Sequence, residues 1–115
     1  MKIEGEGQLL RIFIGESDRA EGQPLYKAIV SKARSMGLAG ATVLRGMAGF
    51  GAHSRMHTAK ILRLSEDLPI VIEIVDHEER IQEFLPELDS MVKEGLITLE
   101  RIHIIAYRYD EDGKK

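Results

Sequence analysis

The chain has 115 residues, of which 43% are hydrophobic and 30% charged, and its formal net charge is −3 at pH 7. We expect a single globular domain over residues 1–115, because this length can bury a core and the composition is not that of a disordered chain. No apolar run reaches the roughly 20 residues that a membrane-spanning helix needs, and no leader peptide is expected. The chain has no cysteine, which excludes disulfides and thiolate chemistry and fits a cytoplasmic protein.

The first half of the chain predicts a strand, a helix and a second strand. Residues 8–14, "QLLRIFI", are rich in β-forming residues and lie between glycine-containing turns. Pro24 is suited to the first turn of a helix, apolar residues follow at helical spacing, and Gly37 stands where a C-cap is expected. We therefore predict a helix over 24–36 and a strand over 41–45.

The second half begins with a long loop, 46–58, followed by predicted strands at 59–64 and 70–76. Asp76 and Glu79 have the spacing of a capping box for a second helix. Pro86 lies inside that helix and predicts a kink or an early end. The residues 97–108 predict a last strand or strand pair, and 109–115 a frayed polar tail. The apolar stripe of the second helix is expected at Ile81, Phe84, Leu85, Leu88 and Met91.

This order predicts a ferredoxin-like βαββαβ sandwich, with a four-stranded antiparallel sheet and both helices on one face. In the segments 8–14 and 70–76, apolar residues occupy both odd-numbered and even-numbered positions, so both faces of the sheet are apolar. The face without helices therefore also needs a cover. An apolar face of this size usually indicates an oligomer. We therefore expect a homo-oligomer whose sheets pack against one another.

Charge is divided sharply along the chain. Seven lysine and arginine residues and no acid lie between Glu21 and Glu66. Such a segment is a candidate surface for an anion. The alternative is that its cations pair with the acidic remainder, within or between subunits.

The loop 46–58 is longer than the two to five residues that an ordinary hairpin needs. Its glycines allow close approach of the backbone to a ligand, and consecutive N–H groups can bind an anion. The alternative is that they only form turns in a flexible loop.

The segment "TVLRGMAGFG" at the end of the second strand resembles the PII signalling superfamily. Together with "LPIVIEIVD" and "GLITLERI", it is more closely similar to an uncharacterised PII-like family of bacteria and archaea, over about residues 8–108. The resemblance implies a signalling protein that is not an enzyme. It also implies a homotrimer that binds an adenine nucleotide (ATP, ADP or AMP, with or without magnesium) between subunits. The long loop would report the nucleotide to a protein partner such as a transporter or an enzyme, with no role for nucleic acid.

The resemblance also implies which residues contact the nucleotide. One group lies on and next to the loop: Arg45, Gly46, Gly49, Phe50, Gly51 and Arg55. A second group would come from the turn before the last strand and from its end: Lys93, Gly95 and Arg108. The sequence departs from the superfamily at Ala52 and His53, which stand where PII proteins have arginine and glutamine.

Several of these residues have other interpretations. Phe50 is suited to stacking on a base, and equally to anchoring the loop on its neighbour. The arginines are suited to phosphate, and equally to ion pairs with acids such as Glu66, Asp67 or Glu73.

His53 and His57 are spaced as a metal pair but have no carboxylate beside them, while His77 and His103 are expected to be structural or surface groups. The alternative functions are a trimeric divalent-metal binding or tolerance protein on the same fold, and a purely structural oligomer. There is no P-loop motif and no catalytic triad pattern.

Overall fold

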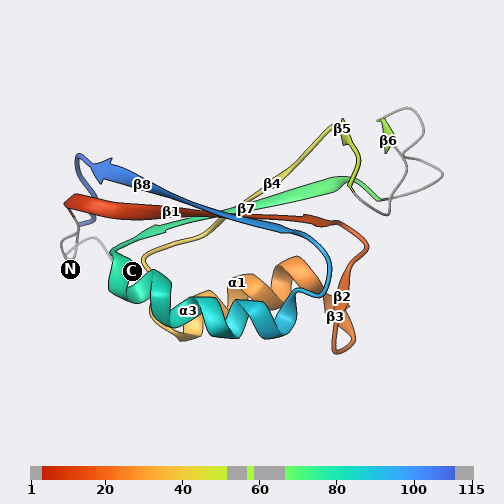
Figure 1. The fold of residues 1–115 in the computed structure, drawn as a ribbon, viewed down its shortest axis with the longest axis horizontal. Coiled ribbons are helices and arrows are strands. Elements are labelled where there is room, and N and C mark those ends of the chain that lie inside the picture. Colours follow the sequence, from red (N-terminus) through yellow and green to blue (C-terminus); the bar gives the residue numbers. More distant parts are fainter. Residues whose placement is uncertain (1–3, 52–56, 59–66, 111–115) are drawn as a thin grey trace.

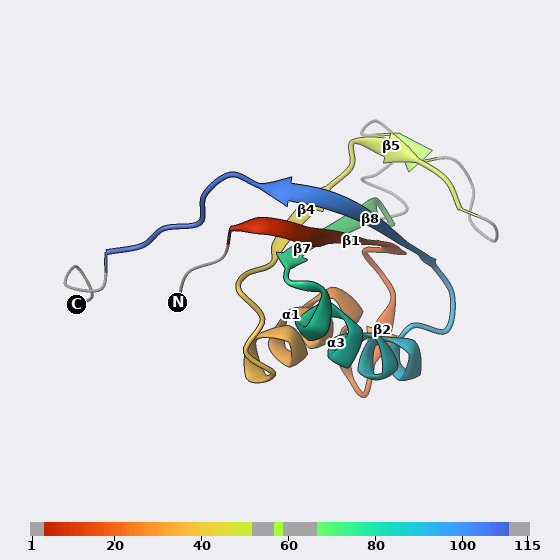
Figure 2. The same ribbon diagram turned by 60° about the vertical axis from the view of Figure 1, so that its left-hand side comes forward.

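The structure is a computed structural model, and it describes residues 4–51, 57–58 and 67–110. Four strands form one antiparallel sheet in the order β4-β7-β1-β8, and both helices lie on one side of it (Figures 1 and 2). The elements are β1 Gly5–Gly15, α1 Leu25–Ser35, β4 Thr42–Arg45, β7 Pro69–Asp76, α3 Glu78–Met91 and β8 Leu96–Ile104. The predicted ferredoxin-like architecture is confirmed.

The core lies between the helices and the two central strands. Every second residue of β1 and β7 points toward the helices, which is the alternation that a strand imposes. Each such apolar side chain contributes about 1.5–3 kcal/mol when it is fully buried. The core residues are Leu10, Ile12, Ile14, Leu25, Ile29, Ala33, Ile70, Ile72, Ile74, Ile81, Phe84 and Leu88.

The end of α1 follows the prediction. Gly37 has a φ of 82°, and its N–H donates to the carbonyl of Arg34 at 3.1 Å. The N–H of Leu38 donates to the carbonyl of Ala33 at 3.1 Å. These two bonds satisfy the last helical carbonyls, and the left-handed conformation favours glycine at this position.

The predicted capping box of α3 is wrong. The N-cap is His77, and it makes no side-chain capping bond. Asp76 is fully buried, and its carboxylate accepts the N–H of His77 at 2.6 Å and that of Ala39 at 2.9 Å. Pro86 lies inside α3, which continues to Met91 without an early end.

One predicted strand is longer than the strand observed, and another falls outside the described residues. The last strand was predicted to reach residue 108, but β8 ends at Ile104 and residues 105–110 are not part of the sheet. In this segment, the hydroxyl of Tyr107 donates to the carbonyl of Ala39, a pairing that a strand pattern does not reveal. The predicted strand 59–64 lies outside the described residues. Two short hairpins were not predicted: β2 Arg19–Ala20 with β3 Gln23–Pro24, and β5 Ala48–Gly49 with β6 His57–Thr58.

The sheet face turned away from the helices, here called the open face, is apolar around a charged centre. The register places Leu9 beside Val75 and Phe13 beside Val71 on this face. Between these pairs, Arg11 donates to Glu73 at 2.9 Å and to Glu100 at 3.4 Å. The hydrogen bond to Glu73 raises the pKa of Arg11 above its ordinary value. The open face therefore combines apolar surface with an ion-paired arginine.

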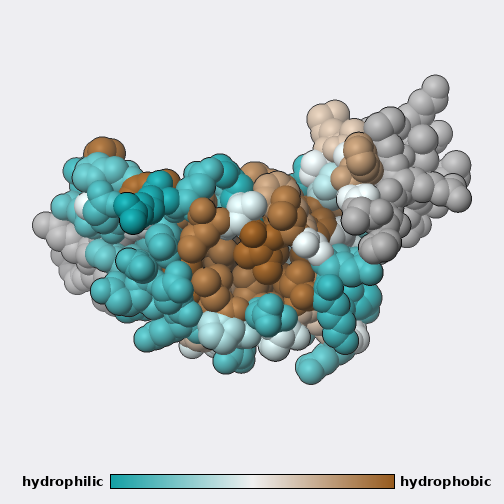
Figure 3. Space-filling model, viewed as in Figure 1, coloured by the Kyte–Doolittle hydropathy of each residue, from teal (hydrophilic) through white to brown (hydrophobic). Residues whose placement is uncertain are grey.

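A second apolar surface lies on the side of the molecule. Figure 3 shows it between the sheet and the helix layer, in the middle of the view. The register turns Ile97 and Leu99 toward the helix side, beside Ile12 and Leu10. They are nevertheless 38% and 40% exposed, because β8 is an edge strand.

Candidate functional site

The chain between β4 and β7 leaves and rejoins the sheet at one place, which we call the loop root. We define it as Glu16, Arg45, Gly46, Gly49 and Pro69. The N–H of Gly46 donates to the carbonyl of Pro69 at 2.8 Å, and that of Glu16 donates to the carbonyl of Leu68 at 2.8 Å. Beyond the root, β5 and β6 stand away from the sheet, at the end opposite to the termini (Figure 1). The root is thus an ordered base for the loop that was predicted at 46–58.

Gly46 and Gly49 pack against the ring of Pro69. A Cβ at Gly46 would lie 2.9 Å from Cγ of Pro69, and one at Gly49 would lie 3.1 Å from it. Gly49 also has a φ of +154°. A side chain at either position would collide with the proline unless the backbone moved. These two predicted ligand-binding glycines therefore have a structural reason of their own.

Arg45 is paired with Glu16, an acid that the sequence did not identify as its partner. Its Nη2 donates to Oε2 of Glu16 at 2.7 Å. The side chain of Arg45 is 59% exposed and that of Glu16 is 24% exposed. The register explains the pair, since Arg45 lies opposite Ile70, which lies opposite Ile14, and Glu16 is the next residue on that face.

The acids predicted as partners for the arginines are placed differently. Asp67 accepts the N–H of Ser17 at 3.2 Å, and Glu73 pairs with Arg11 on the open face. Glu66 lies outside the described residues. The position of Glu16 directly after a strand was visible in the sequence, but the cation beside it depends on the order of strands in the sheet.

The described start of the loop presents apolar side chains to solvent. Phe50 is 73% exposed and Met47 is 76% exposed. Both interpretations of Phe50, as a stacking surface or as an anchor on a neighbour, are consistent with this exposure. Arg55 and His53 lie outside the described residues, and the side chain of His57 is not described.

Lys93 and Gly95 form the turn between α3 and β8. A Cβ at Gly95 would lie 2.8 Å from the carbonyl oxygen of Phe13, so this glycine allows the turn to approach β1 closely. The turn is at the same end of the sheet as the loop root, because Leu96 pairs with Phe13 and Pro69 pairs with Gly15. The turn leads into β8, which pairs with β1, the strand before Glu16, whereas Arg45 lies on the β4 edge, with two strands between β4 and β8.

Arg108 lies after the other end of β8, in an extended segment that leaves the body (Figure 2). Its neighbour Tyr107 donates its hydroxyl to the carbonyl of Ala39 at 2.8 Å. The rings of Tyr107 and Tyr109 meet edge to face with centroids 6.0 Å apart, so Tyr109 of the predicted tail has a defined contact. One protomer therefore divides the predicted ligand residues among the loop root, the Lys93 turn and the C-terminal segment.

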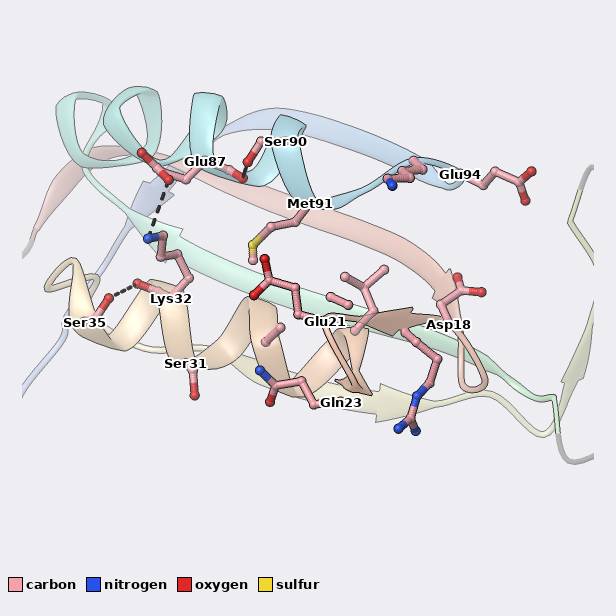
Figure 4. Close-up of a pocket in the computed structure, with 15 residues that line it drawn as sticks. Asp18, Glu21, Gln23, Ser31, Lys32, Ser35, Glu87, Ser90, Met91 and Glu94 are labelled. Carbon is pink, nitrogen blue, oxygen red and sulfur yellow. Dashed lines mark hydrogen bonds and ion pairs between the residues drawn. The ribbon is translucent and has the colours of Figure 1, made fainter.

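A groove of about 800 Å³ lies elsewhere, between α1, the end of α3 and the β2–β3 hairpin (Figure 4). The sequence did not predict this groove, and among the predicted ligand residues that the structure describes, Lys93 alone lines it. Several of its polar groups bond within the chain. Lys32 pairs with Glu87 at 3.6 Å, and the hydroxyls of Ser35 and Ser90 donate to carbonyls of their own helices.

The part of the chain that the structure describes shows neither a metal-ligand cluster nor a membrane-spanning helix. It contains no group of three or more histidine, cysteine or acidic side chains that could hold a metal ion. None of its helices is long and apolar enough to cross a membrane.

Comparison with known proteins gives a family and close relatives. The family model DUF190, described as "Uncharacterized ACR, COG1993", matches residues 7–104. A UPF0166 protein of Aquifex aeolicus (strain VF5) is 44% identical over 98 residues, which cover 85% of this chain and 92% of the relative. The UPF0166 protein MJ1524 of Methanocaldococcus jannaschii is 38% identical over 100 residues, covering 86% of this chain and 92% of the relative.

Solved structures of low sequence identity share the fold. CPII of Thiomonas intermedia K12, a nitrogen regulatory PII-like protein solved with ADP, AMP and bicarbonate, superposes with a TM-score of 0.63. It is 17% identical, and the match covers 86% of this chain and 94% of CPII. The GlnK–ATP complex of B. subtilis gives a TM-score of 0.50 at 14% identity, covering 87% and 84% of the two chains. The PII-like resemblance seen in the sequence is confirmed.

Proposed function

The chain belongs to the DUF190 family, and from this premise we propose that it is a PII-like regulatory protein that binds an adenine nucleotide at the loop root and is not an enzyme. The observation that carries the proposal is the exposed Arg45 at the end of β4, directly before the loop glycines, in a fold shared with adenylate-bound CPII and GlnK. A guanidinium is suited to bidentate contact with phosphate.

The proposed site is composite. One protomer supplies the loop root and the start of the loop, with contributions from Phe50, Gly51 and Arg55. Neighbouring protomers supply Lys93, Gly95 and Arg108, because within one chain the Lys93 turn lies at the β8 edge, opposite to Arg45 on β4, and Arg108 follows the far end of β8. Magnesium is proposed as an optional companion of the polyphosphate.

The proposed assembly is a homotrimer. The apolar open face favours burial against other copies of the chain. Arg45 and the Lys93 turn lie on opposite edges of the sheet, at β4 and β8. A site that joins them needs the β4 edge of one protomer to face the β8 edge of the next. Such a head-to-tail contact closes into a ring rather than a two-fold dimer.

The loop is proposed to report the nucleotide to a protein partner. Met47 and Phe50 are exposed on the segment that stands away from the sheet, where a partner has access to them. Phosphate contacts at the root would change the order or direction of this segment, as in other ligand-ordered loops.

A thermal-shift screen with parallel mass measurement tests the proposal. ATP, ADP and AMP are added with and without Mg²⁺, and Cu²⁺ and Zn²⁺ are added alone. A nucleotide present at about 100 times its dissociation constant stabilises the protein by roughly 2.7 kcal/mol. A response to an adenylate supports the proposal, and no response to any adenylate overturns it. A response to the metals alone favours the metal-binding alternative.

A further inference from the structure

We propose that Glu16 is a built-in competitor for the nucleotide phosphate: it holds Arg45 in the empty protein and releases it when phosphate binds. This inference rests on the proposed function, because it concerns how the same site is regulated. It starts from the 2.7 Å bond between Arg45 Nη2 and Glu16 Oε2, an interaction that neither the sequence pattern nor the comparisons assign.

The two partners of this pair differ in how firmly they are held. Glu16 belongs to a turn fixed by three bonds: its own N–H to Leu68, the Ser17 N–H to Asp67 at 3.2 Å, and the Gly15 N–H to Asp18 at 3.0 Å. Its side chain is 24% exposed, against 59% for Arg45. The carboxylate is therefore the less exposed partner on an ordered turn, and the more exposed guanidinium is the side chain that has room to turn toward a ligand.

Carboxylate and phosphate compete for the same donors. A guanidinium presents five N–H groups in a planar fork that fits both anions. The bond to Glu16 uses Nη2, and within the described residues it is the one ion pair of Arg45. A phosphate that approaches the edge of the guanidinium containing Nη2 therefore competes with the carboxylate of Glu16 for this nitrogen. An exposed ion pair of this kind reduces the apparent affinity by about two- to fivefold.

Release of Arg45 from Glu16 also removes one of the bonds that hold the base of the loop. In the structure, the turn that carries Glu16 is bonded to both ends of the connection between β4 and β7, at Arg45 and at Leu68. Phosphate binding removes the first of these attachments and leaves the second. The competitor thus couples occupancy of the site to the freedom of the loop base.

General charge repulsion is a simpler way in which Glu16 could weaken phosphate binding. Glu16, Asp18 and Asp67 are three carboxylates near the root, and any of them would repel a polyphosphate. General repulsion predicts that removing any of these charges strengthens binding. Competition for Arg45 predicts that Glu16 alone matters, because neither Asp18 nor Asp67 bonds to Arg45.

The experiment is isothermal titration of ADP into wild type, Glu16→Gln and Asp18→Asn. Both variants lose one negative charge from the same turn, and both keep an oxygen that accepts a hydrogen bond. We expect Glu16→Gln to lower the dissociation constant about two- to fivefold and Asp18→Asn to leave it near the wild-type value. Thermal melting of the apo variants controls for folding.

The outcomes distinguish failure of the proposed competition between Glu16 and phosphate from failure of nucleotide binding itself. Equal tightening in both variants, or no tightening in Glu16→Gln while wild type binds ADP, overturns the competitor and leaves nucleotide binding intact. Failure of wild type and Glu16→Gln to bind ADP, ATP or AMP overturns both.

Discussion

The buried carboxylate of Asp76 accepts a hydrogen bond from the backbone N–H of Ala39, 37 positions earlier in the chain. The same carboxylate accepts the N–H of His77, so a single side chain joins the end of β7, the start of α3 and the connection before β4. On its other side, the carbonyl of Ala39 accepts the hydroxyl of Tyr107. Residues distant in sequence are therefore fixed at one end of the sheet by side-chain bonds to the backbone of a single residue, Ala39.

Replacing Asp76 by alanine is expected to lower the free energy of unfolding by about 2–3 kcal/mol. Two partly buried backbone N–H groups would lose their acceptor, a fully buried carboxylate. Urea denaturation measures the loss. The control is Asp89→Ala, an exposed aspartate on α3, which should change stability by less than about 0.5 kcal/mol. Equal effects of the two substitutions would show that the buried bonds contribute nothing specific.

Gly46→Ala is expected to destabilise the ligand-free protein by about 1–3 kcal/mol, because the new methyl group would overlap the ring of Pro69. A second substitution, Pro69→Ala, should recover most of this loss by removing the ring. Gly40→Ala is the matched control, since no atom lies within 4 Å of a Cβ at that position. If Gly46→Ala is as stable as Gly40→Ala, the packing role of Gly46 is wrong, and its place in the motif must be explained by ligand contact alone.

Val75→Glu on the open face is expected to convert the assembly to monomers, as measured by light scattering. The residue is 36% exposed in one protomer, so a lone chain tolerates the charge, whereas an interface between sheets would bury it without a partner. Val75→Thr keeps the branched shape without the charge and should leave the mass unchanged. An unchanged mass for Val75→Glu would mean that the open face is not the interface.

Lys93→Gln and Arg108→Gln are each expected to weaken ADP binding about tenfold, which corresponds to one lost charge-assisted hydrogen bond. Titration calorimetry measures the dissociation constants. Arg101→Gln removes the same charge from an exposed position on β8 and should have little effect. A similar loss of ADP affinity in Arg101→Gln would mean that the change in net charge alone weakens binding. Lys93 and Arg108 would then not belong to the proposed site.

The sequence alone determined the main helices and strands of the fold and the family. Runs of β-forming apolar residues in β1 and β7, the helical spacing of the α1 and α3 stripes, and Gly37 at a helix end are local signals that need no knowledge of the fold. The long glycine motif carried the resemblance to PII-like proteins for the same reason, since it is contiguous in the chain.

The tertiary structure alone decided which side chains meet. The order β4-β7-β1-β8 brings Arg45 to Glu16 and folds Gly46 onto Pro69, and the connection before β4 brings Ala39 to Asp76. It also places the Lys93 turn at the β8 edge, opposite to Arg45 on β4, and Arg108 beyond the far end of β8. Backbone hydrogen bonds pair any strand with any other, so sheet order is set by the packing of the whole core. Contacts between residues tens of positions apart follow from that packing and leave no periodic signal in the sequence.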